Sequence, residues 1–279
     1  MSSDPTGTFP SFDDLFSNLN HFILRLVGLH QAGNLDSWET LEREVKGYFT
    51  PERLEEMESL VPGWQKMASY SDGITLVHVM CVFLGLFMLP EFRVLSSDQQ
   101  QLAKWVILFH DVSKKFTTGA GEKDRTHAFR SAVIAAQQLP RTGFAATPAY
   151  DDLIDSWSSL THSATRLSAD HLELLQDNRR LPDILAGIEN LFGKDTPTAL
   201  IIQSVLLHMS LNVVRDWPQA APLTEDEIKR YIDLDLLPLL RVMMLADNEG
   251  WSLFDPDIRA QQRKDTLQAF QRIKKSLLR

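Results

Sequence analysis

The chain has 279 residues, of which 44% are hydrophobic and 23% charged, and this length and composition suit one large soluble domain or two small ones. A formal net charge of −9 and a pI of about 5.4 argue against a protein that coats nucleic acid non-specifically, since such proteins present a basic face, but they leave open a small anionic substrate held by a few cations. The single cysteine, Cys81, excludes an internal disulfide and favours a reducing, cytoplasmic compartment.

The first part of the chain, residues 1–70, is predicted to be a helical extension. Met1–Thr8 is polar and lacks the apolar core of a secretory signal. Residues 11–32 carry apolar side chains at helical spacing. Thr50-Pro51 predicts the start of a further helix, with Thr50 as the N-cap and Pro51 at the first helical position.

The most apolar run, Ile74–Leu89, follows Ser71-Asp72-Gly73 and stops at Pro90. It is short for a membrane span and contains His78. We therefore interpret it as a buried helix and expect no membrane association.

The next predicted helix ends in an adjacent histidine and aspartate, His110-Asp111, and Lys114 follows three residues later. Ser97 and Gln100 have the spacing of a capping box that would start it. Burying an imidazole and a carboxylate costs free energy unless each has a partner, and a metal ion would satisfy both. Because neighbouring residues point about 100° apart on a helix, one ion reaches both only where the helix end relaxes.

A polar loop with two glycines, Thr117–Arg125, is predicted to precede a helix over Thr126–Leu139 that begins with His127. Residues 140–198 have a weaker helical pattern and are interpreted as a helical insert. Within this insert we expect helices at Ser168–Leu175 and Pro182–Phe192.

The last third is also predicted to be helical. Residues 199–216 form an apolar helix that carries His208, and Thr224–Glu227 is a capping box for the next helix. Asp235 is predicted to cap a helix that ends at Asp247–Gly250. The C-terminal residues, 256–279, form an amphipathic helix whose other face is basic. That face fits RNA or a partner protein, but a solvated face on a packing helix is the favoured interpretation.

Four histidines and two aspartates lie in these apolar helices or at their ends: His78, His110, Asp111, His127, His208 and Asp247. Taken singly, each has a plain structural interpretation, as a hydrogen-bonded core histidine or a helix-end carboxylate. Together they suit a divalent ion such as Mn, Fe, Co, Ni or Zn, and less readily Mg alone. The absence of clustered cysteines excludes a thiolate site.

This order of residues resembles the HD superfamily of helical metal-dependent phosphohydrolases. The superfamily pattern is a lone His, an adjacent His-Asp and a distant Asp, matched here by His78, His110-Asp111 and Asp247. The stretch from Val205 to Asp247 is similar to the HD region of bacterial tRNA nucleotidyltransferases, although residues 1–70 show no pattern of their nucleotidyltransferase head. The resemblance implies an all-α fold: an HD-domain-like helical bundle over residues 71–255, with the insert at about 140–198 poorly matched.

The resemblance also implies roles for the site residues. His78, His110, Asp111 and Asp247 would hold one metal ion. Asp111 would bridge to a second ion, for which His127 and His208 are candidate ligands and His162 competes with His208. Whether one or two ions bind is left open.

Other residues have weaker implied roles. Lys114 would neutralise charge that develops on phosphorus, or it is a solvated lysine. Arg125 and Arg130 are weaker candidates for phosphate binding, and Asn248 and Glu249 are candidates for substrate contacts. Three further histidines are interpreted as structural or as surface residues: His21, His30 and His171, the last in the first turn of a helix capped by Ser168.

The function implied is hydrolysis of a phosphomonoester or phosphodiester, on a nucleotide-like substrate, by a metal-activated water in which Asp111 and Lys114 take part. Lys114 does not match the acidic pair of the alarmone hydrolases, and the Gly-Tyr-Pro motif of the cyclic-di-GMP branch is absent, so the substrate stays open. Two alternatives remain: a non-catalytic regulatory module that binds metal, and a diiron oxygenase on the same fold. The expected partner is a small phosphorylated molecule, and nucleic acid is not favoured.

Overall fold

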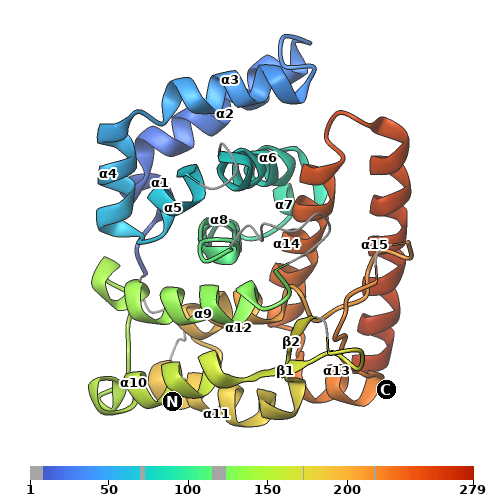
Figure 1. Ribbon diagram of the computed structural model, residues 1–279. Helices are drawn as coiled ribbons and strands as arrows, with labels where there is room; N and C mark the ends of the chain where they lie inside the picture. The colour runs from blue at the N-terminus through green and yellow to red at the C-terminus, as the bar shows by residue number, and fades with distance from the viewer. Residues whose placement is uncertain (1–8, 70–72, 115–123, 172, 217) are drawn as a thin grey trace.

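The structure, a computed structural model, describes residues 9–69, 73–114, 124–171, 173–216 and 218–279. These residues form fifteen α-helices and a two-stranded sheet (Figure 1), which confirms the predicted all-α class. Met1–Thr8, Ser71-Asp72 and all but the last two residues of the predicted loop Thr117–Arg125 lie outside the described residues. Within the described residues no helix has the length and apolar character needed to cross a membrane.

Five helices precede residue 70: α1 (Phe12–Leu15), α2 (Ser17–Gln31), α3 (Trp38–Tyr48), α4 (Pro51–Leu60) and α5 (Trp64–Ser69). The Thr50 hydroxyl accepts the Arg53 amide hydrogen at the start of α4, as predicted for an N-cap. The predicted helix over 11–32 is broken at Phe16, so α1 and α2 are separate. Helices α2, α3 and α5 all pack on α6 (Figure 1).

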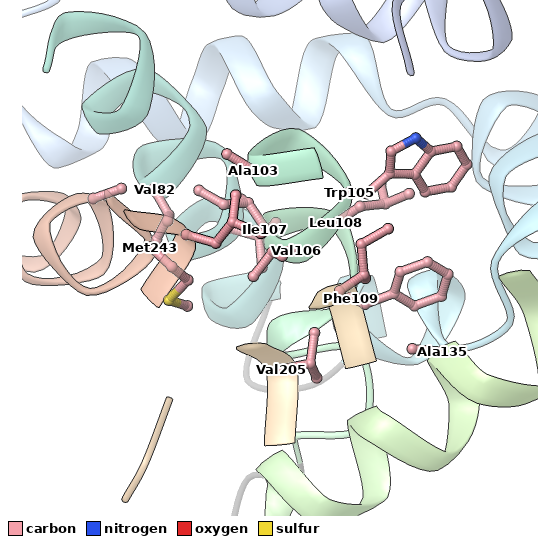
Figure 2. Packing of buried hydrophobic residues seen from close by; sticks show 14 of the residues in the cluster. Val82, Ala103, Trp105, Val106, Ile107, Leu108, Phe109, Ala135, Val205 and Met243 are labelled. Carbon is pink, nitrogen blue, oxygen red and sulfur yellow. The ribbon is translucent and has the colours of Figure 1, made fainter. Parts of the chain in front are cut away.

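The centre of the molecule is built from α6 (Ile74–Met88), α8 (Ser97–His110), α9 (His127–Gln138), α12 (Pro197–Leu207) and α14 (Leu236–Trp251). Helix α8 contacts all the others of this group (Figure 1). Every residue from Leu102 to His110 is buried, so α8 buries more than the single face that its apolar spacing predicted. Figure 2 shows Trp105 and Phe109 of α8 within this core.

The start of α8 differs from the prediction by one residue. Ser96, not Ser97, is the N-cap, and its capping-box partner is Gln99, not Gln100. The sequence contains two overlapping Ser-x-x-Gln patterns, and the extended backbone at Ser96 selects the first.

The closest helix pair is α6 and α14, and two glycines allow their approach. A Cβ on Gly85 would lie 3.1 Å from the backbone oxygen of Ala246, and a Cβ on Gly250 would lie 3.1 Å from the backbone nitrogen of Val82. Small residues let helix backbones approach closely, and this pair carries His78 and Asp247 into the site.

The remaining elements are α7 (Pro90–Arg93), η2 (Leu139–Thr142), α10 (Tyr150–Ser163), β1 (Thr165–Leu167), β2 (Leu174–Gln176), η3 (Asn178–Arg180), α11 (Leu181–Phe192), α13 (Glu225–Tyr231) and α15 (Pro256–Leu277). Strands β1 and β2 are antiparallel, with Arg166 opposite Leu175. The prediction of a helix over Ser168–Leu175 is therefore wrong. His171, expected in its first turn, has φ of 61° and lies in the connection between the strands.

Two helix boundaries in the last third also differ from the predictions. Helix α12 ends at Leu207, so His208 is its C-cap and residues 209–216 are not helical. Asp235 makes no side-chain cap at the start of α14, and the carboxylate of Asp233 accepts the Leu236 amide hydrogen instead. The capping box of Thr224 and Glu227 is confirmed.

Candidate metal centre

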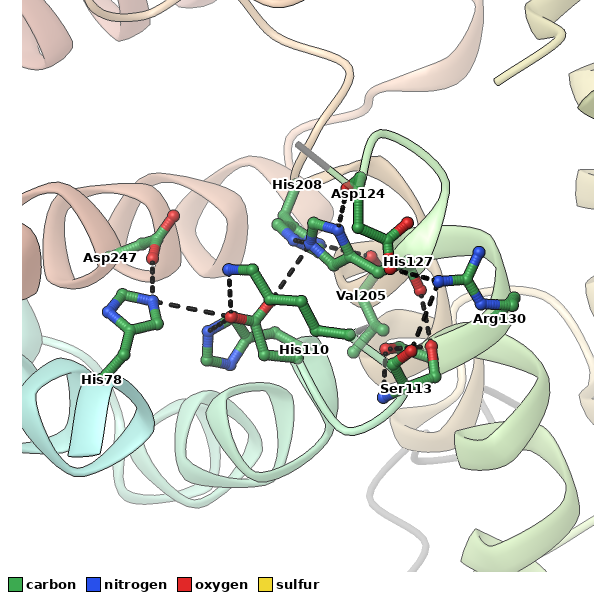
Figure 3. A network of polar contacts seen from close by, with 12 residues as sticks. His78, His110, Ser113, Asp124, His127, Arg130, Val205, His208 and Asp247 are labelled. Atoms are coloured by element: carbon green, nitrogen blue, oxygen red, sulfur yellow. Dashed lines mark hydrogen bonds and ion pairs between the residues drawn. The ribbon is translucent and has the colours of Figure 1, made fainter. Parts of the chain in front are cut away.

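Six predicted ligands come from five helices or their ends. His78 lies in the first half of α6, His110 ends α8, Asp111 is the C-cap of α8, His127 begins α9, His208 is the C-cap of α12, and Asp247 lies in the last turns of α14. We call these six residues the His–Asp cluster. Figure 3 shows His78 and Asp247 facing each other on one side, and His127 close to His208 on the other.

Asp111 is the residue that the two sides share. Its backbone has left the helical conformation, with φ of −111° and ψ of 8°, as expected if the helix end relaxes. Its Oδ2 lies 3.6 Å from Nε2 of His78 and 3.7 Å from Nε2 of His110, and its Oδ1 lies 3.0 Å from Nε2 of His127. One carboxylate therefore presents a different oxygen to each group of imidazoles.

Two sets of three ligand atoms lie within 4.8 Å of one another in the described residues: His78, His110 and Asp111, and then Asp111, His127 and His208. Both are subsets of the ligand sets that the resemblance implied. Asp247 belongs to neither set at this distance, but its Oδ1 lies 3.0 Å from Nε2 of His78. The buried histidines and aspartate can hold a metal ion.

Three of the histidines are oriented by the backbone of their own turn. Nδ1 of His110 contacts the carbonyl of Ile107 at 2.7 Å, and Nδ1 of His208 contacts that of Val205 at 2.7 Å (Figure 3). Nδ1 of His127 contacts the carbonyl of Asp124 at 2.6 Å. Because a carbonyl only accepts, each Nδ1 carries the hydrogen, and each Nε2 presents a lone pair to the cluster.

In this tautomer the buried Nε2 atoms carry no hydrogen, so they cannot donate hydrogen bonds. Nε2 of His127 and Nε2 of His208 lie 3.1 Å apart, so two lone pairs face each other unless a cation lies at this point. Nε2 of His110 is buried and has no hydrogen-bond partner among the described residues. Unpartnered buried polar atoms are costly, and a metal ion satisfies them without any proton.

Protonation of His208 or His110 does not resolve this geometry. Burial, together with the neighbouring His127, lowers the pKa of His208 to about 3. Burial likewise lowers the pKa of His110, against the opposing charge of Asp111. Both rings are therefore neutral at pH 7, in the form that binds a metal ion.

Lys114 is the cation of the site. Its Nζ lies 2.6 Å from Oδ2 of Asp111, and its side chain is 27% exposed. Burial alone would raise the pKa of Asp111, but the ammonium of Lys114 holds that pKa well below its ordinary value. Burial alone would raise the pKa of Asp247 too, but the hydrogen bond from His78 lowers it. Two carboxylates against one ammonium leave negative charge for a cation to balance.

The end of α8 is attached to α9 by a serine pair that the sequence analysis missed. The Ser113 hydroxyl donates to the backbone oxygen of His127 at 3.1 Å, and the Ser131 hydroxyl accepts the Ser113 amide hydrogen at 3.2 Å (Figure 3). These contacts hold His127 against Asp111. Isolated serines give no signal in the sequence, because their pairing depends on how two helices meet.

Several weaker candidates have structural contacts. Arg130 binds Asp124 and Thr126, and its Nη2 donates to the Ser113 carbonyl at 3.3 Å, so it supports the loop end before α9 (Figure 3). Arg125 lies 3.6 Å from a Glu173 oxygen. Both arginines therefore have partners in the fold, and phosphate binding by either stays a prediction.

Asn248 and Glu249 point toward α15, not into the site. Asn248 donates to the Thr266 hydroxyl at 3.0 Å. Glu249 is buried and accepts from Arg259 at 3.0 Å and from Arg263 at 2.6 Å. Arg263 is therefore paired with carboxylates of the fold and does not belong to a solvated basic face of α15.

The other histidines lie outside the His–Asp cluster. His162 is exposed near the end of α10, so His208 and not His162 lies beside His127. His30 contacts the Leu35 carbonyl at 2.8 Å through Nδ1, which is a structural role, and His21 is exposed.

The arrangement amounts to a buried cluster of nitrogen donors around one shared carboxylate, with a lysine at its edge. Comparison of the chain with protein-family models, with curated proteins and with solved structures gave no match in any of the three. The chemistry of the site is therefore argued from its own residues.

Proposed function

We propose that this chain is a metal-dependent phosphohydrolase of the HD type, which cleaves a phosphomonoester or phosphodiester. One observation carries the proposal: Asp111 presents one oxygen to His78 and His110 and the other to His127, which is the geometry of a carboxylate that bridges two divalent ions. The HD resemblance of the sequence, which is carried by His78, His110-Asp111 and Asp247, favours the same assignment.

The residues fit such ions. His78, His110, Asp111 and Asp247 would hold the first, and Asp111, His127 and His208 the second. Mixed imidazole and carboxylate donors favour Mn, Fe, Co, Ni or Zn over Mg alone. A bound divalent ion supplies a water of lowered pKa and neutralises charge on phosphate oxygens.

The chain's own groups have separate tasks. Asp111 holds the cluster together: it accepts a hydrogen bond from Lys114, and its Oδ1 lies 3.0 Å from Nε2 of His127. Burial alone would lower the pKa of Lys114, but attraction to Asp111 and Asp247 and the hydrogen bond to Asp111 together raise it, so the ammonium stays charged at pH 7. A charged, partly exposed ammonium beside the cluster suits a role in neutralising a phosphoryl oxygen as the ester bond breaks.

The decisive experiment combines metal analysis with turnover. The protein as purified is analysed for metal, then assayed with Mn, Co, Ni and Mg against phosphomonoesters and phosphodiesters. The Asp111→Asn variant is expected to lose bound metal and to lose turnover at least about 100-fold, with unchanged far-UV circular dichroism. Asp183→Asn, at an exposed carboxylate on α11, is the matched control and is expected to behave as the wild type.

The same measurements separate the alternatives. Metal without turnover on any phosphoester, together with unchanged behaviour of a His110→Ala variant, would favour a regulatory module. Iron as the dominant metal, with oxygen consumption, would favour a diiron oxygenase. Full hydrolytic activity of Asp111→Asn would refute the site assignment.

A further inference from the structure

Among the described residues, the His–Asp cluster reaches solvent at Asp247 and beside Lys114. The side chains of His78, Asp111, His127 and their buried neighbours are at most 2% exposed. Asp247 is 24% exposed and Lys114 is 27% exposed. A substrate that reaches the cluster therefore has to approach past these two residues.

A large aromatic side chain lies at this same opening. Trp251, the last residue of α14, is one turn beyond Asp247 and is 48% exposed. Its indole is stacked on the ring of His78, with ring centroids 4.2 Å apart and an interplanar angle of 23°. The ammonium of Lys114 lies 5.6 Å from the indole centroid. Because His78 covers one face of the indole, the exposed surface belongs mainly to the other face and the edge.

The N-terminal helices fix the position of this indole. Trp38, the first residue of α3, contacts Trp251 with ring centroids 6.5 Å apart and contacts Phe254 with centroids 5.7 Å apart. An indole that is stacked on His78 and contacted by Trp38 loses little further freedom when a ligand binds, so it is preorganised for stacking.

We propose that Trp251 is a stacking platform for the substrate, and that the substrate is a nucleotide whose base lies on the outer face of the indole while its phosphate lies at Asp247 and Lys114. This inference rests on the proposed function and names its substrate class. A flat ring beside an ammonium matches the two parts of a nucleotide, because bases stack on aromatic side chains and phosphates pair with cations.

The test measures binding without turnover. Two phosphonates in which a CH2 group replaces the ester oxygen serve as probes: the analogue of adenosine 5′-monophosphate and the analogue of ribose 5-phosphate, which lacks the base. Their affinities for the full-length, Mn-loaded protein are measured by calorimetry. Stacking of one base on an aromatic side chain strengthens binding roughly 5- to 150-fold. We expect the wild type to bind the adenosine analogue at least about tenfold more tightly than the ribose analogue.

The variants assign this preference to the indole. Trp251→Ala should bring the two affinities within about twofold of each other and leave the ribose analogue's affinity unchanged, whereas Trp251→Phe should keep most of the preference. Val94→Ala removes an exposed apolar side chain from the turn after α7 and serves as the control, with no effect expected. Circular dichroism checks that each variant folds.

Two results would overturn the inference: equal affinities in the wild type, or an unchanged preference in Trp251→Ala. Equal weakening of both probes by Trp251→Ala is one form of the second result and would mean that the indole only covers His78. The inference and the proposed function also fail separately. Hydrolysis of phosphoesters with no preference for a base refutes the platform but not the hydrolase, and base-dependent binding with no turnover refutes the hydrolase but not the platform.

Discussion

The approach of α6 and α14 makes a quantitative prediction for Gly250→Ala. The added Cβ would lie 3.0 Å from Cγ2 of Val82, 3.1 Å from its N and 3.2 Å from its Cα. The last two atoms belong to helix backbone and cannot rotate away, so the two helices must separate by a few tenths of an ångström. Overpacking of this kind costs about 1–3 kcal/mol. The higher helix propensity of alanine relative to glycine offsets about 1 kcal/mol of this loss. The net expectation is a loss of about 0–2 kcal/mol in the free energy of unfolding.

Gly28→Ala is the matched control, since a Cβ there meets no atom within 4 Å on α2. It should stabilise the protein by up to about 1 kcal/mol. Urea denaturation followed by circular dichroism gives both values. Metal affinity, measured by competition with a chelator, should fall in Gly250→Ala alone, because α6 and α14 hold His78 and Asp247 3.0 Å apart. Equal stabilisation by the two substitutions would refute the packing argument.

Three further predictions concern stability and reactivity. Glu249→Gln removes the negative charge that pairs with both Arg259 and Arg263, and it should lower the free energy of unfolding, measured by urea denaturation, by about 1–3 kcal/mol. This is less than for a fully buried pair, because both arginines are about a quarter exposed. A loss below about 0.5 kcal/mol would contradict this expectation. Burial alone raises the pKa of Glu91, but hydrogen bonds from Arg263 hold that pKa below 4.5. The stabilisation by Glu91 is therefore full above pH 4.5 and is lost as the pH falls through the folded-state pKa. The difference in Tm between wild type and Glu91→Gln should shrink in acid and not in alkali. Burial raises the pKa of the Cys81 thiol, so a thiol reagent at pH 8 should modify it only after unfolding, and rapid modification of the native protein would contradict its burial.

Much of the fold could be predicted from the sequence because its signals are local. Thr50-Pro51 and the Thr224 capping box specify helix starts through their own backbone contacts. The spacing of apolar residues located most helices, although the pattern missed α3. It could not predict that β1 and β2 pair, because the positive φ of His171 is visible only in the folded chain.

The candidate site divides in the same way. The order of histidines and aspartates along the chain singled out six residues, and the structure brings five of them into two sets around Asp111, with Asp247 against His78. The sequence could not predict which arginines have partners in the fold, because Arg130 and Arg263 find their carboxylates through tertiary contacts. Trp251 gave no signal either, since its importance depends on what it stacks on.

In three of the four clustered histidines, Nδ1 contacts the carbonyl three residues earlier, and this has a consequence for engineering. For His110, His127 and His208 the orientation of the ring is set by a contact within four consecutive residues. A short peptide segment that contains these four residues therefore keeps the direction in which Nε2 points. His78 has no such contact in the described residues, and its ring takes its direction from Asp247 and Trp251 instead. Transferring this centre to another helical scaffold would thus need three short segments, each of which orients its own histidine ring. The fourth histidine, His78, would have to be transferred together with Asp247 and Trp251.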